Sequence, residues 1–186
     1  FSTMSGVTAL GQGNYGQVWQ VPVSTPSDLL RLIGGGRAGS LEDQTQVADQ
    51  YYRALQQEGA QYVIVKCMSQ QENAEIEIEM TQAIGRATMG DEWTGCRFIG
   101  AYHPPDTSHV QQQWRLVMKP VQSERPVMNL EDYLDQQGSL LTDQDKESLA
   151  RDLVDIVKYF NEDKQIGLLD LKASNFLVVQ RGGHAH

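Results

Sequence analysis

Strand signals and helix signals are unevenly distributed along this chain, which narrows the folds that it can adopt. Alternating apolar residues interrupted by glycines at 10–23 predict two strands joined by a turn, and the β-branched run at 62–68 predicts a third strand. Strand-like segments at both ends of residues 96–119 predict a hairpin. Apolar residues beyond this point recur at helical spacing. We therefore predict an α+β fold with a strand-rich first part, residues 1–119, and a mostly helical second part, residues 120–186.

Residues 22–60 interrupt this order and are interpreted as an insertion between two strands. They contain a short predicted helix that ends at the glycines of residues 34–36, followed by a polar predicted helix at 41–57. The apolar stripe of the polar helix is predicted to be Val47, Tyr51 and Leu55. Two interpretations of the insertion stay open: it docks a partner, or it only decorates the first part of the fold.

Two other helices carry clear apolar periodicity. Residues 72–87 predict a helix in which glutamates surround one apolar face. That face is predicted to consist of Ile76, Met80, Ala83 and Ile84. Thr142 and Asp145 form a capping-box pattern, with aspartate in the glutamate position, at the start of the second helix. The apolar residues of this helix are Leu149, Leu153, Ile156, Val157 and Phe160.

The composition excludes some classes of partner. With 40% hydrophobic and 21% charged residues among 186, the chain is typical of a globular protein. The formal net charge of −9 argues against nucleic acid or an anionic membrane as a general partner. The apolar runs are too short to form a transmembrane segment.

The cysteines and the first residue suggest a compartment. Cys67 and Cys96 lie in strand-like apolar settings and are predicted to be buried, reduced thiols. We therefore expect an intracellular, reducing location. The sequence starts at Phe1 and shows no signal peptide, so the cytoplasm or an organelle interior such as a plastid, reached after removal of an upstream targeting peptide, is expected.

A glycine-rich turn at 11–18 fits the pattern G-x-G-x-x-G-x-V. Gly11, Gly13 and Gly16 allow the backbone to approach a polyphosphate and to offer its N–H groups, while Val18 can cover a base. A plain glycine-rich hairpin is the alternative interpretation. A dinucleotide-binding fold is disfavoured because a strand, and not a helix, follows the glycines.

Lys66 ends an apolar strand and is predicted to hold phosphate groups. The alternative is a lysine that only extends from a strand end into solvent. Its predicted ion-pair partner is Glu77, because Met80 and Ile84 follow Glu77 at +3 and +7 on the same helix. A solvated acidic helix face is the alternative interpretation of that glutamate.

Residues 170–175 read Asp-Leu-Lys-Ala-Ser-Asn and lead into an apolar run. The carboxylate of Asp170 can accept a hydroxyl proton, the ammonium of Lys172 can hold a phosphate, and the amide oxygen of Asn175 can reach a metal. This arrangement suits phosphoryl transfer. We therefore predict Asp170, Lys172 and Lys66 as catalytic residues and Asn175 as a metal ligand.

Taken in order, these motifs resemble the protein kinase family, and Asp-Leu-Lys-x-x-Asn points to its serine/threonine branch. The resemblance implies a strand-rich N-terminal lobe, then a hinge near residue 120, a short helix at 130–134 and the catalytic loop of a helical C-terminal lobe. It also implies ATP and magnesium as cofactors, with Met118 as gatekeeper and Leu177 under the adenine. The implied nucleotide-binding residues are Gly11, Gly13, Gly16, Val18, Lys66, Glu77, Met118, Val121 and Leu177.

The chain departs from the family pattern in ways that weaken the implied activity. Leu168 and Leu169 stand where the family has His-Arg, and Ile64 narrows the base pocket where the family usually has alanine. No Asp-Phe-Gly follows the catalytic-type loop, and residues 180–186 are expected to be a flexible tail rather than a metal pair of histidines. Because Asn175 alone is a poor magnesium site, we expect this polypeptide not to turn over ATP at a useful rate.

Two functions therefore stay open. The first is an ATP-dependent serine/threonine protein kinase, seen as a fragment. The second is a non-catalytic, pseudokinase-type scaffold or a structural subunit of a larger assembly. A protein partner is expected in the second case, covering apolar residues of the helix at 149–160.

Overall fold

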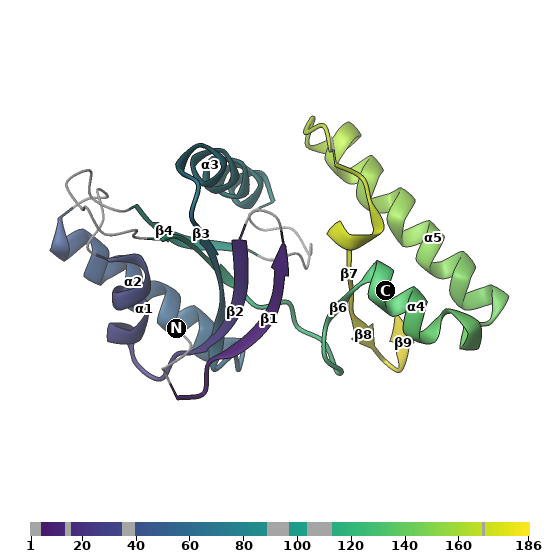
Figure 1. The fold of residues 1–186 in the computed structure, drawn as a ribbon, viewed down its shortest axis with the longest axis horizontal. Coiled ribbons are helices and arrows are strands. Elements are labelled where there is room, and N and C mark those ends of the chain that lie inside the picture. Colours follow the sequence, from purple (N-terminus) through teal and green to yellow (C-terminus); the bar gives the residue numbers. More distant parts are fainter. Residues whose placement is uncertain (1–4, 14–15, 35–39, 89–96, 104–112, 169) are drawn as a thin grey trace. The chain divides into compact units, whose positions relative to one another are not determined.

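The computed structural model describes residues 5–13, 16–34, 40–88, 97–103, 113–168 and 170–186. They fall into two compact units, the first ending at Pro120 and the second comprising Val121–His186. Figure 1 shows helices and antiparallel strands in an α+β arrangement, as predicted. Within the described ranges, every helix is too short or too polar to cross a membrane.

The first unit is built on a five-stranded antiparallel sheet with strand order β1-β2-β3-β5-β4 (Figure 1). Its strands are β1 (Thr8–Gly13), β2 (Gly16–Pro22), β3 (Tyr62–Met68), β4 (Arg97–Tyr102) and β5 (Trp114–Lys119). The predicted strand pair, the central strand and the hairpin are thus confirmed. The strand assignment succeeds because β-branched and apolar residues fit a pleated, half-buried surface.

The insertion forms two helices, α1 (Pro26–Ile33) and α2 (Leu41–Gln57), between β2 and β3. Both helices contribute to the larger hydrophobic core, which also contains inward-facing residues of the sheet. The buried residues of this core are Val21, Val23, Leu29, Leu32, Ile33, Ala48, Leu55, Val63, Val65, Cys67, Ile99 and Val117. The insertion therefore completes the first unit, and the interpretation as surface decoration is wrong. The predicted stripe on α2 is also corrected, because Ala48 is buried whereas Val47 is 37% exposed.

Helix α3 (Gln71–Ala87) contributes to a second, smaller core with the other side of the sheet. This core comprises Met68, Ala74, Ile78, Trp114 and Leu116. The predicted apolar face of α3 is wrong: Ile76 is 53% exposed and Met80 is 50% exposed, while Ala74 and Ile78 are buried. Only two residues separate β3 from α3, and this short connection restricts how the helix can rotate against the sheet.

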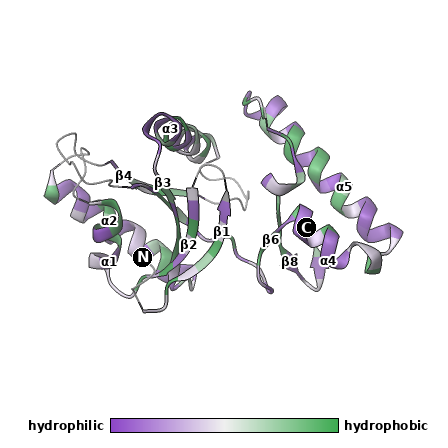
Figure 2. Cartoon of the chain, viewed as in Figure 1, coloured by the Kyte–Doolittle hydropathy of each residue, from purple (hydrophilic) through white to green (hydrophobic). Residues whose placement is uncertain are grey.

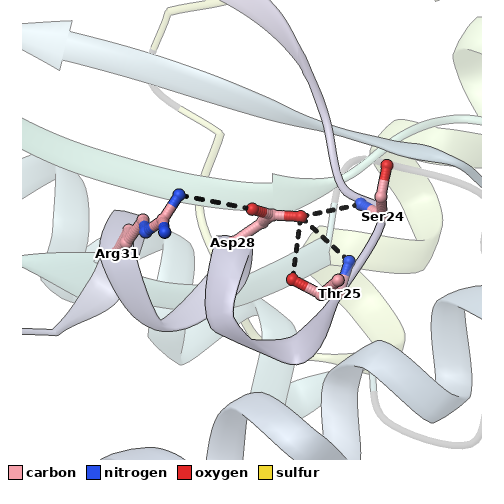
Figure 3. Close-up of polar contacts among 4 residues, drawn as sticks. All are labelled: Ser24, Thr25, Asp28 and Arg31. Carbon is pink, nitrogen blue, oxygen red and sulfur yellow. Dashed lines mark hydrogen bonds and ion pairs between the residues drawn. The ribbon is translucent and has the colours of Figure 1, made fainter.

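The start of α1 is fixed by the carboxylate of Asp28 (Figure 3). Its Oδ2 atom accepts hydrogen bonds from the backbone N–H groups of Ser24 at 3.0 Å and Thr25 at 2.9 Å, and from the Thr25 hydroxyl at 3.0 Å. Burial opposes ionisation of Asp28, but these hydrogen bonds and the nearby Arg31 together lower its pKa. The carboxylate thus satisfies donors that the first turn of a helix leaves without partners.

Asp28→Asn is expected to lower the free energy of unfolding by about 1 kcal/mol, since the amide is a weaker acceptor for the capping donors. The stabilisation from Asp28 should be present above about pH 4 and be lost as pH falls through the lowered folded-state pKa. Urea unfolding of wild type and variant at neutral and acidic pH tests this. A stability difference that grows as pH falls would contradict it.

The second unit contains the strand pair β6 (Met128–Asn129) and β7 (Leu177–Val178) and the helices α4 (Leu130–Gln137) and α5 (Asp143–Lys158). The predicted capping box is confirmed, because Thr142 and Asp145 exchange backbone-to-side-chain hydrogen bonds at 3.0 and 3.2 Å. The buried core residues of this unit are Leu130, Tyr133, Leu149 and Val178.

Residues 180–186 form a hairpin, so the prediction of a flexible tail is wrong. Its strands are β8 (Gln180–Arg181) and β9 (His184–Ala185). The carboxylate of Glu124 accepts hydrogen bonds from the backbone N–H groups of Gly182 at 2.8 Å and Gly183 at 3.3 Å in the turn. His186 also contacts Asp152 of α5 at 3.3 Å. These partners are distant in sequence, but a local sign was also present, because Gly182 and Gly183 both have a positive φ in the turn, as a Gly-Gly hairpin turn requires.

Candidate functional site

The strand register of the first unit places several predicted residues on one face of the sheet. Val18 of β2 and Leu116 of β5 are the direct cross-strand neighbours of Lys66 on β3. Ile64 is paired in the same way with Met118. Directly opposite residues of antiparallel strands project to the same side, so all five lie on one face. This is the face on which α3 packs, since Leu116 belongs to its core and Met118 packs against that core.

The three predicted glycines lie on β1 and β2. Gly11 is paired with Val18, and Gly13 is paired with Gly16 at the end of the β1–β2 ladder. Gly16 has a φ of +148°, which side chains rarely permit, and an added Cβ would collide with the carbonyl oxygen of Cys67. Residues 14 and 15 of the glycine-rich turn lie outside the described residues.

Lys66 and Glu77 form an ion pair, with 2.5 Å between Nζ and Oε1, so the predicted pairing is confirmed. Both side chains are partly shielded, with exposed fractions of 21% and 31%. Helix α3 starts after a connection of only two residues from β3, which explains how a glutamate 11 positions after the lysine reaches it. The role of the pair in holding phosphate stays a prediction.

Cys67, next to Lys66, projects to the opposite side of β3 into the larger core. Burial raises the pKa of its thiol to about 11, so the group is protonated and unreactive near neutral pH. The predicted buried free thiol is thus confirmed for Cys67, whereas Cys96 lies outside the described residues.

In the second unit the loop before β7 brings Asp170, Lys172 and Asn175 together. The ammonium Nζ of Lys172 lies 2.9 Å from Asp170 Oδ2. The Asn175 side-chain amide donates to the backbone oxygen of Asp170 at 2.8 Å and to its Oδ2 at 2.9 Å. The hydrogen bond from Lys172 and then that from Asn175 lower the pKa of Asp170. Asp170 is therefore ionised at neutral pH, and the lowered pKa makes its carboxylate a weaker proton acceptor than an ordinary aspartate.

This loop does not offer a ready magnesium site. Magnesium requires several oxygen ligands in octahedral geometry, usually including carboxylates. The one carboxylate here, Asp170, is engaged by the Lys172 ammonium, and the described residues contain no group of three or more histidine, cysteine, aspartate or glutamate side chains able to hold a metal. The residues as placed therefore do not fit a magnesium ion.

The remaining predicted residues are also placed within their own units. Val121 is buried at the start of the second unit, and Leu177 is 44% exposed on β7, opposite Asn129. The group around Lys66 belongs to the first unit and the group around Asp170 to the second. Each group is internally assembled, and the function of each stays a prediction.

Asn175 has a contact that was not predicted from the sequence, in which its amide holds Asp170 in place. It was predicted only as a metal ligand, yet its amide holds both the backbone and the carboxylate of Asp170. The only signal was the residue type, because asparagine side chains commonly bond to nearby groups in turns and loops.

The fold and the two groups define an α+β protein with a lysine–glutamate pair on its sheet and an acid–base–amide loop in its helical unit. A comparison with models of protein families gave no match to this chain, and a search of curated proteins gave no match either.

Proposed function

We propose that this chain is a nucleotide-binding domain of protein-kinase type, related in its site to serine/threonine kinases. ATP is the proposed ligand, bound beside Lys66 with its phosphates near the glycine-rich β1–β2 turn. Asp170 is the proposed proton acceptor and Lys172 the proposed phosphate contact. The kinase-like fold is part of the proposal.

The observation that carries the proposal is the Lys66–Glu77 ion pair on the face of the sheet that also bears Val18 and Met118. A carboxylate at 2.5 Å fixes the ammonium in a partly shielded position, ready to meet an anionic ligand without loss of side-chain freedom. The neighbouring Val18, Ile64 and Met118 offer apolar surface suited to a base. A solvated strand-end lysine would need neither feature.

Lys66→Met is expected to weaken ATP binding by about ten- to a hundredfold, because a hydrogen bond to a charged group is worth about 1.5–3 kcal/mol. Calorimetric titration with ATP, with and without magnesium, measures the dissociation constant directly. A thermal-shift titration reports the same loss as a smaller stabilisation at each ATP concentration.

Lys119→Met is the matched control for this variant. Lys119 is likewise a strand lysine, at the end of β5, and is ion-paired, 2.6 Å from Glu58 of the chain segment after α2, with an exposed fraction of 14%. It is adjacent in sequence to Met118, so alternation along β5 directs it to the other face of the sheet. Equal loss of ATP binding in both variants, or no ATP binding by wild type, would refute the proposed nucleotide site.

A non-catalytic scaffold is the second candidate, favoured by the magnesium misfit of the Asp170 loop. An assay of phosphate transfer from ATP to a serine- or threonine-containing protein distinguishes the two candidates. Turnover that Asp170→Asn abolishes would identify an enzyme. ATP binding without turnover would identify a binding module.

A further inference from the structure

Helix α3 has a second apolar side that its own unit does not use. Ala74 and Ile78 fill the core against the sheet, whereas Ile76 and Met80 are 53% and 50% exposed. Ile76 and Met80 are one turn apart and therefore adjacent on the helix surface, and exposed Ala83 continues the row. Figure 2 shows hydrophobic and strongly hydrophilic positions together on this helix. The exposed row, Ile76, Met80 and Ala83, is called the outer face of α3.

Acidic side chains border this outer face. Glu72 lies one turn before Ile76, and Glu79 lies beside Met80; both glutamates are exposed. The whole chain has a formal net charge of −9, so the surrounding potential has the same sign. A complementary surface would present apolar side chains at the centre and positive charges at its edge.

We propose that the outer face of α3 binds a basic amphipathic helix of a partner protein. Two apolar side chains of that helix, three or four positions apart, would pack on Ile76 and Met80 as ridges pack into grooves between helices. Its lysine or arginine residues would pair with Glu72 and Glu79. The apolar contact would supply most of the affinity, and the charges would favour encounter and orientation.

A second copy of the chain fits this surface less well. Symmetric pairing of two outer faces would bring the glutamates of one copy towards those of the other, which costs affinity. A single helix row also offers much less than the roughly 800 Å² per partner that a standard stable interface buries. A helix of opposite charge avoids the like-charge repulsion, and a contact of this small area suits a weak, transient complex rather than a stable dimer.

The proposed surface is separate from the nucleotide group. Glu77 follows Ile76 directly but points to Lys66 on the sheet, so the two sides of α3 carry different contacts. Substitutions on the outer face should leave ATP binding unchanged, and Lys66→Met should leave helix binding unchanged. Failure of either function is therefore distinguishable from failure of the other.

The test uses a synthetic amphipathic peptide with leucines at i and i+4 spacing and lysines elsewhere. We expect the full chain to bind it, and the double variant Ile76→Ser, Met80→Ser to bind it about tenfold or more weakly. Glu72→Gln with Glu79→Gln should reduce the salt dependence of binding. Fluorescence anisotropy of the labelled peptide measures all three proteins.

The matched control is Leu140→Ser with Val154→Ser, which removes two large apolar side chains, 74% and 51% exposed, from the second unit. Circular dichroism verifies that each variant is folded. Equal weakening by both double variants, or no binding by wild type, would overturn the proposal. Sedimentation showing a wild-type dimer that only the α3 variant dissociates would overturn it in favour of a second copy.

Discussion

Leu29→Ala is expected to lower the free energy of unfolding of the first unit by about 2–5 kcal/mol. Leu29 lies in α1, within the insertion, and its exposed fraction is 0%. The substitution removes apolar contacts and leaves a cavity beside the strands of the sheet, which close packing prevents from refilling completely. An effect of this size means that the insertion helices and the sheet unfold together.

The measurement is denaturant unfolding followed by tryptophan fluorescence. Trp19 and Trp114 belong to the first unit, so in a Trp93→Phe background the signal reports this unit even if the two units unfold separately. Leu41→Ala is the control, because Leu41 begins α2 with an exposed fraction of 71% and should change stability by less than about 0.5 kcal/mol. Similar effects of both substitutions would mean that the insertion is detachable from the sheet.

Gly16→Ala is expected to destabilise the first unit by about 2–4 kcal/mol, through backbone strain and a steric clash together. The strain arises because the residue has a φ of +148°. The clash arises because the new Cβ meets the carbonyl oxygen of Cys67 on the adjacent strand, and backbone cannot move aside as the end of a side chain can. Strands β2 and β3 would have to separate locally.

Gly11→Ala is the control for strain and steric clash, because it adds a Cβ to another glycine of the same pattern. A Cβ on Gly11 meets nothing within 4 Å, so its stability should change by less than about 0.5 kcal/mol. Comparing the two unfolding midpoints by the same fluorescence assay tests the prediction. Similar destabilisation by both alanines would indicate a general strand-propensity effect. Because Gly11→Ala stays folded, it also probes whether ATP needs close approach to that backbone.

Local features were predictable because they depend on neighbours in sequence. The β-branched run of β3 identified a strand, and Thr142 with Asp145 identified the start of α5, where both hydrogen-bond partners lie within one turn. The Lys66–Glu77 pair was also predicted, although the supporting argument placed Met80 in the core. Met80 is in fact half exposed, and Glu77 reaches Lys66 from the side of α3 that faces the sheet.

Predictions from the sequence were wrong where a residue contacts a segment far along the chain. Helical spacing identified α3 but not its buried side, because the helix carries apolar residues on two sides. The short connection from β3 and packing against Trp114 and Leu116 bury the side with Ala74 and Ile78. Likewise, Glu124 holds a turn 58 residues away.

Apolar periodicity and turn residues in the sequence were enough to predict the α+β class, the order of the helices and the order of the five strands of the main sheet. Packing against segments far along the chain established the rest. It placed the insertion in the core, turned Ile76 and Met80 outward, and ordered the last residues into a hairpin. Hydrophobic burial is non-directional, so an apolar pattern indicates only that a surface is suited to burial. Three-dimensional packing determines which apolar surface is buried.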